Sequence, residues 1–363
     1  MTIEVNKSIR DSQPKLAGIE AGRGIAAIMV VLFHATGIMN LPKYFSTEPL
    51  NGFFNFGYAG VDFFFVLSGF IILFIHFDDI EKKGVFGSYV RKRFLRIYPI
   101  YWVVSFLVIA ALFFIPSIGP VPDASYIIQS LLLIPQNTMP LVIVAWTLTH
   151  EIFFYIIFGF IIYRRNLGLF IIGAWFLGIL TSAIFDLKFN YFFNFIFSIN
   201  NIGFFLGMAI ALAARSFNNI HQPRLIAAVG IILFLATGML NVYSMLLFPK
   251  FFTVLYAISS SLIIFGLVIS EREHRFNIKK WFALLGASSY SIYLIHFLAL
   301  SFFIKILKKL NIEHVISINV IFFILVIAVT LTGILFHILI EKPLLAKLMK
   351  KKHPNVLLLK TIE

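Results

Sequence analysis

Six ionisable side chains lie within long apolar runs of the sequence, namely His34, Asp62, His150, Glu151, His296 and His337. Inserting such a group into a bilayer costs about 2.5 to 3.5 kcal/mol, so each one is a functional candidate by default. An imidazole exchanges a proton near neutral pH, and a buried carboxylate must be paired or protonated. The set predicts either acid-base catalysis inside a membrane or a proton relay of the kind that transporters use.

Three arginines add a capacity for binding anions. Arg23 precedes His34 by eleven residues, which at 100° per residue puts both within ~20° on one helix face, about 16 Å apart along the axis. Arg93 and Arg96 are three residues apart and share a helix face at the membrane boundary. Guanidinium groups bind phosphates in a bidentate way. We therefore expect a basic site for a phosphorylated ligand, joined to a buried histidine and carboxylate site.

Simpler explanations compete with this interpretation. An arginine-rich loop can serve only as a positive anchor of topology, and a lone intramembrane histidine can bond a neighbouring helix. The second explanation applies most to His150 and His337. Because 44 of the 363 residues are Phe, lipid contact accounts for most aromatic side chains. We therefore assign no aromatic residue to an acceptor site from the sequence.

The composition shows what must hold these side chains in place. Hydrophobic residues make up 60% of the chain and charged residues 13%, whereas a soluble domain carries about 25% charge. The long runs are apolar on all sides, which favours helices over the alternating strands of a barrel. We predict an all-α bundle of about ten spans: 22–39, 58–77, 97–115, 145–163, 167–185, 193–214, 225–242, 251–270, 284–304 and 319–340.

The basic residues predict the orientation of this bundle. Of the 30 Lys and Arg residues, 24 fall in the N-terminal segment, the C-terminal tail and alternate loops, which makes those parts cytoplasmic. We expect a cytoplasmic segment at 1–21, one transmembrane domain at 22–343 and a basic cytoplasmic tail at 344–363 in a multi-pass protein of the inner (plasma) membrane. The net charge of +14 is explained by topology, so no nucleic-acid partner is expected. The absence of cysteine excludes thiolate catalysis and thiolate metal ligands.

Several segments match one family in order along the chain. They are Arg23 to His34, Gly60 to Phe70, Lys92 to Pro99, Trp146 to Glu151, Ser289 to His296, and Glu341-Lys342-Pro343. Together they resemble the membrane-bound acyltransferase family 3, whose members move acyl groups onto sugars and other hydroxyl-bearing acceptors. The resemblance covers roughly residues 16 to 343. Thr147 stands where the family commonly has Ser, and Thr149-His150 is an unusual lead into Glu151.

The resemblance implies an acyl-coenzyme A donor, with acetyl as the expected acyl group. The donor's phosphates would meet Arg23, Arg93 and Arg96 at the cytoplasmic face. The acceptor would be a carbohydrate or another hydroxyl-bearing molecule, and its identity stays open. We expect no tightly bound cofactor and no metal.

Catalysis would then fall to the buried groups. His34 would be the general base that takes a proton from the acceptor hydroxyl, oriented by Asp62 or Glu151. His296 would bind the acceptor or donate to the developing oxyanion. Ser68 is a further substrate contact, and its use as a covalent carrier is the less favoured route. A proton-coupled transporter or flippase that uses the same histidines and carboxylates is the alternative.

Overall fold

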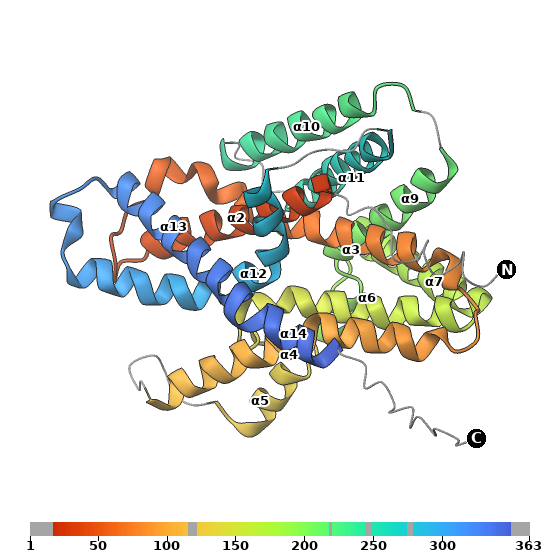
Figure 1. The fold of residues 1–363 in the computed structure, drawn as a ribbon, viewed down its shortest axis with the longest axis horizontal. Coiled ribbons are helices and arrows are strands. Elements are labelled where there is room, and N and C mark those ends of the chain that lie inside the picture. The colour runs from red at the N-terminus through yellow and green to blue at the C-terminus, as the bar shows by residue number, and fades with distance from the viewer. Residues whose placement is uncertain (1–16, 115–121, 218–219, 244–248, 274–278, 350–363) are drawn as a thin grey trace, which may run out of the picture.

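The computed structural model describes residues 17–114, 122–217, 220–243, 249–273 and 279–349, and all regular secondary structure within them is helical (Figure 1). Ten helical segments are long and apolar enough to cross a membrane. Their main helices are α2 (Ala17–Met39), α3 (Gly60–His76), α4 (Val85–Phe114), α6 (Trp146–Tyr163), α7 (Arg165–Ile184), α9 (Ile202–Ser216), α10 (Pro223–Tyr243), α11 (Pro249–Glu273), α12 (Lys280–Lys309) and α13 (Ile318–Phe336).

Shorter elements connect or extend these helices. They are η1 (Pro49–Ala59), η2 (Phe77–Asp79), α5 (Ala124–Leu131), η4 (Ile143–Ala145), α8 (Tyr191–Ile196), η5 (Ile199–Asn201), η6 (Ile312–His314), the π-helical turn η7 (His337–Glu341) and α14 (Lys342–Met349). The turn η7 precedes Pro343, which has no backbone N–H to continue an α-helical ladder. The Lys342 N–H donates to the His337 carbonyl five residues back, which keeps the chain helical up to the proline.

The ten predicted spans are confirmed as an all-helical architecture with ten candidate spans. The largest difference is at α4, which begins at Val85 although we predicted a loop until residue 96. This part of α4 places Tyr89 inside and Lys92 outside, so it is an amphipathic helix whose charges conceal it from a hydropathy pattern.

An even number of spans returns the chain to the end of the bundle at which α2 starts. Residues 1–16 and 350–363, which hold most of the predicted N-terminal segment and tail, lie outside the described residues.

Close helix contacts hold the centre of the bundle together. Helix α3 packs on α9 and α2 packs on α12. At the first contact a Cβ added to Gly207 would lie 2.0 Å from the Val66 carbonyl oxygen, and one added to Gly69 would lie 2.1 Å from that of Phe204. Glycines let two backbones approach closely, which is how helices associate in lipid without a hydrophobic driving force. This packing fixes α3 beside the cavity described next.

Candidate active site

An elongated cavity of about 320 Å³ lies inside the bundle. Five helices line it: α2, α3, α4, α6 and α12. Its lining on α3 extends from Val61 to Ile75, which at 1.5 Å per residue corresponds to about 21 Å along the helix. The polar and charged lining residues are Arg23, Ser68, Arg93, Arg96, Thr147, Glu151, Tyr155, Ser289, Tyr290 and Tyr293. A long ligand with an anionic end is therefore a better match in shape and charge than a compact one.

All three predicted phosphate-binding arginines line this cavity. Arg96 is the most exposed of them and lies over the ring of Tyr290, while Arg93 lies over the ring of Tyr155. Arg23 comes from α2 and lies within electrostatic reach of Arg96 and Glu151. The Nε atom of Arg93 is buried and has no hydrogen-bond partner among the described residues. It is therefore a donor that an anionic ligand can satisfy.

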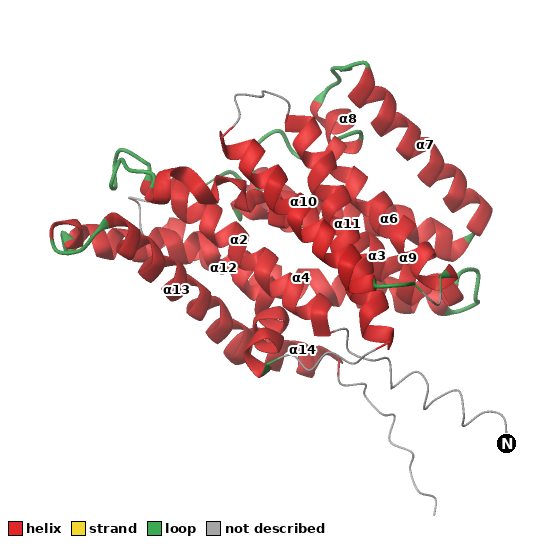
Figure 2. Cartoon of the chain, turned by 90° about the horizontal axis from the view of Figure 1, so that it is seen from above, coloured by secondary structure: helices red, strands yellow, loops and turns green. Residues whose placement is uncertain are grey.

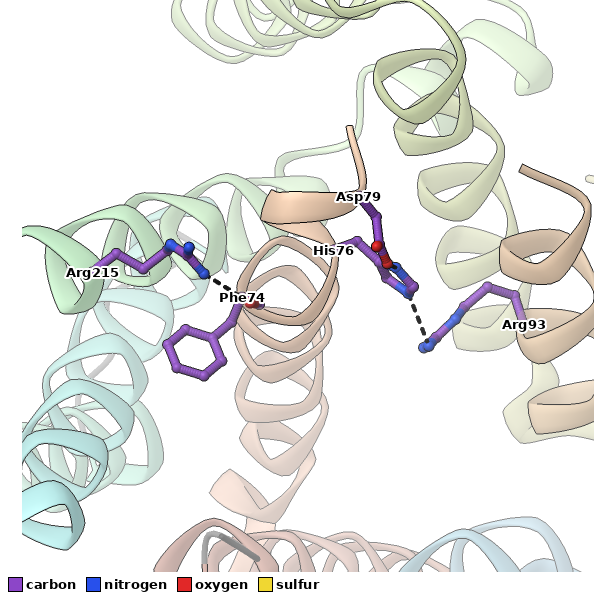
Figure 3. Close-up of polar contacts among 5 residues, drawn as sticks. All are labelled: Phe74, His76, Asp79, Arg93 and Arg215. Atoms are coloured by element: carbon purple, nitrogen blue, oxygen red, sulfur yellow. Dashed lines mark hydrogen bonds and ion pairs between the residues drawn. The ribbon is translucent and has the colours of Figure 1, made fainter. Parts of the chain in front are cut away.

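Arg93 is held by a residue pair at the end of α3 that the sequence analysis did not single out. His76 is 1% exposed, and its Nδ1 lies 3.0 Å from a carboxylate oxygen of Asp79. A carboxylate only accepts, so Nδ1 carries the hydrogen and Nε2 is left to accept from Arg93 Nη2 at 3.5 Å. Figure 3 shows Arg93 approaching His76 on one side of α3, while Arg215 reaches the carbonyl of Phe74 on the other.

Glu151 is the carboxylate inside the cavity. It comes from α6 and accepts hydrogen bonds from Ser68 of α3 at 2.9 Å and from the Tyr155 hydroxyl on the next turn of its own helix. Both hydroxyls are donors here, so the Ser68 oxygen is engaged with Glu151. The sequence analysis assigned Glu151 to the catalytic group of His34 and Ser68 to substrate contact, and in the structure both residues line the cavity of the three arginines. Glu151 also lies within electrostatic reach of Arg23.

His34 and His296 form a pair. His296 Nε2 lies 3.1 Å from His34 Nδ1, and His296 Nδ1 lies 2.6 Å from the carbonyl oxygen of Tyr293. The carbonyl can only accept, so His296 carries its hydrogen on Nδ1 and accepts at Nε2 from His34 Nδ1–H, which also points at the Val30 carbonyl. This chain leaves the lone pair of His34 on Nε2. His296 is 0% exposed whereas His34 is half-buried, so only His34 can meet a substrate.

The histidine pair lies outside the cavity lining and is linked to it through Tyr293. Tyr293 lines the cavity, and its ring centroid is 5.8 Å from that of His296 and 5.9 Å from that of Phe64. The Tyr293 hydroxyl is fixed by Thr147 at 2.7 Å and by the Val144 carbonyl at 3.0 Å. Tyr293 therefore connects the cavity wall on α6 with the histidines.

The structure does not pair His34 with a carboxylate, which differs from the expectation that Asp62 or Glu151 orients it. The described hydrogen bonds of His34 go to Val30 and His296. Asp62 is buried on α3 and lies within electrostatic reach of the hydroxyls of Tyr58 and Tyr256, outside the cavity lining. The sequence places Asp62 and His34 within two spans, but it does not determine which way each side chain points around its helix.

Two further histidines bond side chains outside the central cavity, His150 on another element and His337 within its own helical turn. His150 Nδ1 lies 2.8 Å from the Asn201 amide oxygen, and the His150 ring packs against Phe195. His337 Nδ1 lies 2.7 Å from the Glu341 carboxylate, which also accepts from Ser291 at 2.6 Å. The buried Glu341 thus ties the end of the last span to α12. Its position in the Glu341-Lys342-Pro343 segment was the only sequence signal for this role.

The fold and the cavity are those of a polytopic helical membrane protein with an internal cavity whose wall carries three arginines. A family model described as an acyltransferase domain matches residues 16–338, and the chain belongs to this family. It is 28% identical over 323 residues to the exopolysaccharide production protein ExoZ of Rhizobium meliloti (strain 1021), covering 84% of this chain and 94% of that protein. It is 32% identical over 92 residues to protein 2 in the picA locus of Rhizobium radiobacter, covering 25% and 42%. No solved structure matches the chain.

Proposed function

We propose that this membrane acyltransferase is an O-acyltransferase that moves an acyl group, with acetyl expected, from acyl-coenzyme A to a hydroxyl of a cell-envelope or exported carbohydrate. The observation that carries the proposal is an elongated cavity with Arg23, Arg93 and Arg96 in its wall and with Tyr293 linking it to the His34–His296 pair. The relative with a role in exopolysaccharide production supports a carbohydrate as the acceptor.

The arginines match the donor chemically. An acyl-coenzyme A molecule carries phosphates at one end and a thioester at the other, joined by a long arm. Guanidinium groups bind phosphate oxygens in a bidentate way, and the unpartnered Nε of Arg93 adds a donor. With the phosphates on the arginines, the arm extends along α3 and brings the thioester towards Tyr293.

His34 is the proposed general base. Its Nε2 lone pair accepts the proton of the acceptor hydroxyl as the hydroxyl oxygen attacks the thioester carbonyl carbon. The C–S bond then breaks, the acyl group stays on the acceptor oxygen, and the coenzyme A thiolate takes the proton from His34 Nε2 and leaves as the thiol. His296 Nε2 accepts the hydrogen on His34 Nδ1. This hydrogen bond keeps His34 in the reactive tautomer and persists when His34 becomes an imidazolium. Transfer is direct, with Ser68 engaged by Glu151 rather than acting as a carrier.

Membranes that contain the wild type or His34→Ala, incubated with radiolabelled acetyl-coenzyme A and envelope glycans of the producing organism, test this proposal. We expect base-labile label in the glycan fraction from the wild type and not from His34→Ala, with both proteins present at equal levels in the membrane. Normal acyl transfer by His34→Ala would show that His34 is not the general base. If the wild type transfers no acyl group and instead takes up a solute in a proton-dependent way, the protein is a transporter and not an acyltransferase.

A further inference from the structure

A second, polar hollow lies on the other side of the first turn of α6. Two adjoining cavities of about 610 and 200 Å³ share five lining residues, among them Gln136, Asn137 and Tyr191. They form one groove between the segment that follows α5 and the start of α8. We call it the α5–α8 groove.

This groove opens at the end of the bundle opposite to the ends of α3 and α9. Arg215 of α9 pairs with Asp78 beside the end of α3, and the Arg165 N–H at the start of α7 donates to Glu81, so these elements meet at one end. Helix α8 lies between the last residue of α7 and the first of α9 and is therefore at the other end. Figure 2 shows α8 and α14 at opposite ends of the bundle.

The lining of the α5–α8 groove suits an uncharged, hydroxyl-rich ligand. The aromatic rings of Trp146 and Tyr191 offer flat apolar faces with a polar edge. The side-chain amides of Gln136 and Asn137 both donate and accept, which matches the mixed hydrogen-bonding rim of a sugar. Asn137 is exposed and the described hydrogen bonds leave its amide unused. The lining includes one carboxylate, Asp123, which accepts from the Tyr126 N–H at the start of α5, and among the described residues it contains neither Lys nor Arg, unlike the basic central cavity.

The groove and the central cavity share one wall. On the first turn of α6, Trp146, Thr149 and His150 line the groove, whereas Thr147 and Leu148 line the central cavity. Thr147 holds the hydroxyl of Tyr293, whose ring contacts His296. A ligand in the groove is therefore separated from the proposed site of acyl transfer by a single helical turn and one tyrosine.

We infer that the α5–α8 groove binds the neutral saccharide portion of the acceptor and that the donor enters the central cavity from the other end of the bundle. The inference rests on the proposed function for the role of the saccharide as acceptor, but saccharide binding itself can be measured without acyl transfer. It assigns Asn137 and Tyr191 to acceptor recognition, and it explains why the two cavities differ in charge.

Tyr191→Ala and Asn137→Ala test this inference in purified protein in lipid nanodiscs. The probe is the oligosaccharide fraction released by partial hydrolysis of the producing organism's exopolysaccharide. We expect both variants to raise its dissociation constant and the acceptor KM by tenfold or more. The donor KM and acceptor-independent hydrolysis of acetyl-coenzyme A should not change. Tyr243→Ala is the matched control, because Tyr243 is an exposed tyrosine at the same end of the bundle, outside this groove.

Each outcome bears on the groove separately from the transferase activity. If the wild type transfers the acyl group and both variants match it in binding and acceptor KM, the groove assignment is overturned and the proposed function stands. If the wild type binds the oligosaccharide, the variants do not, and no transfer occurs, the groove is a saccharide site and the proposed function fails. If the wild type does not bind the oligosaccharide, the inference is overturned.

Discussion

His296 Nε2 accepts a hydrogen bond from His34 Nδ1 at 3.1 Å, across the contact between α12 and α2. His296 can accept only because the Tyr293 carbonyl takes its other hydrogen. His296 thus fixes the tautomer of His34, and the backbone carbonyl of Tyr293 fixes the tautomer of His296. The same result is reached elsewhere with a carboxylate, but a neutral partner adds no charge inside the membrane.

Replacing His296 should therefore slow turnover without weakening substrate binding. In His296→Leu the orientation of His34 is lost, and kcat should fall by up to about 100-fold, the scale of a small misplacement of a reacting group. Donor and acceptor KM should stay within about twofold of the wild type. His296→Gln, whose amide oxygen can accept from His34 Nδ1–H, should recover part of the loss. Steady-state kinetics of the wild type and the two variants give kcat and both KM values. A rise in acceptor KM with unchanged kcat would show that His296 binds the acceptor and does not orient His34.

The arginines of the central cavity should control donor affinity. Removing Arg93 or Arg96 deletes charge-assisted hydrogen bonds to the donor phosphates, worth about 1.5 to 3 kcal/mol each, so the donor KM should rise roughly 10- to 100-fold. Arg91→Ala is the matched control, because Arg91 is exposed on the same helix and lies outside the cavity lining. An equal effect at Arg91 and Arg93 would indicate a general role of positive charge in topology instead of a phosphate site.

Much of the site was accessible from the sequence because helical periodicity and topology place residues along and around a helix. Arg23, Arg93 and Arg96 were predicted to bind the donor, Ser68 to contact substrate and Glu151 to act with His34, and these five residues line one cavity, whereas His34, Asp62 and His296 lie outside its lining. The five lining residues stand in segments with few ways to fold in lipid. Periodicity therefore placed them well.

What the sequence did not provide is the direction of each side chain across helix contacts. His76 was not considered because it ends a span, where a polar residue costs little, and only the fold brings it to Arg93. Tyr293 and Glu341 were part of recognised segments, but the bond of Tyr293 to Thr147 spans 146 positions and that of Glu341 to Ser291 spans 50. Such pairings depend on the rotation of each helix about its axis, which is fixed by packing contacts such as Gly207 on Val66.

The contact between α3 and α9 should be sensitive to a single methyl group. In Gly207→Ala the new Cβ would lie 2.0 Å from the Val66 carbonyl oxygen, a backbone atom that cannot move aside without shifting α3. Overpacking of this kind costs about 1 to 3 kcal/mol, so the thermal midpoint of the detergent-solubilised protein should fall. Gly173→Ala on α7 is the control, because a Cβ there meets nothing within 4 Å. Equal midpoints for the two variants would show that the helices separate at no cost.

The His76–Asp79 pair should act on the donor through Arg93. Asp79 fixes the His76 hydrogen on Nδ1, and His76 Nε2 then accepts from the Arg93 guanidinium. In His76→Leu the guanidinium loses this 3.5 Å partner while keeping its charge, so the donor KM should rise by less than in Arg93→Ala, about fivefold to tenfold, the scale of an ordinary hydrogen bond of about 1 kcal/mol. His76→Gln restores an acceptor and should recover most of the donor affinity.

The neighbouring aspartate separates this positioning role from a general loss of structure. Asp78 is adjacent in the chain but pairs with Arg215 on the other side of α3, away from Arg93. Asp79→Asn should raise the donor KM and leave the acceptor KM unchanged, whereas Asp78→Asn should leave both unchanged. If Asp78→Asn and Asp79→Asn raise the donor KM equally, the end of α3 matters for folding only. If neither does, Arg93 binds the donor without help from His76.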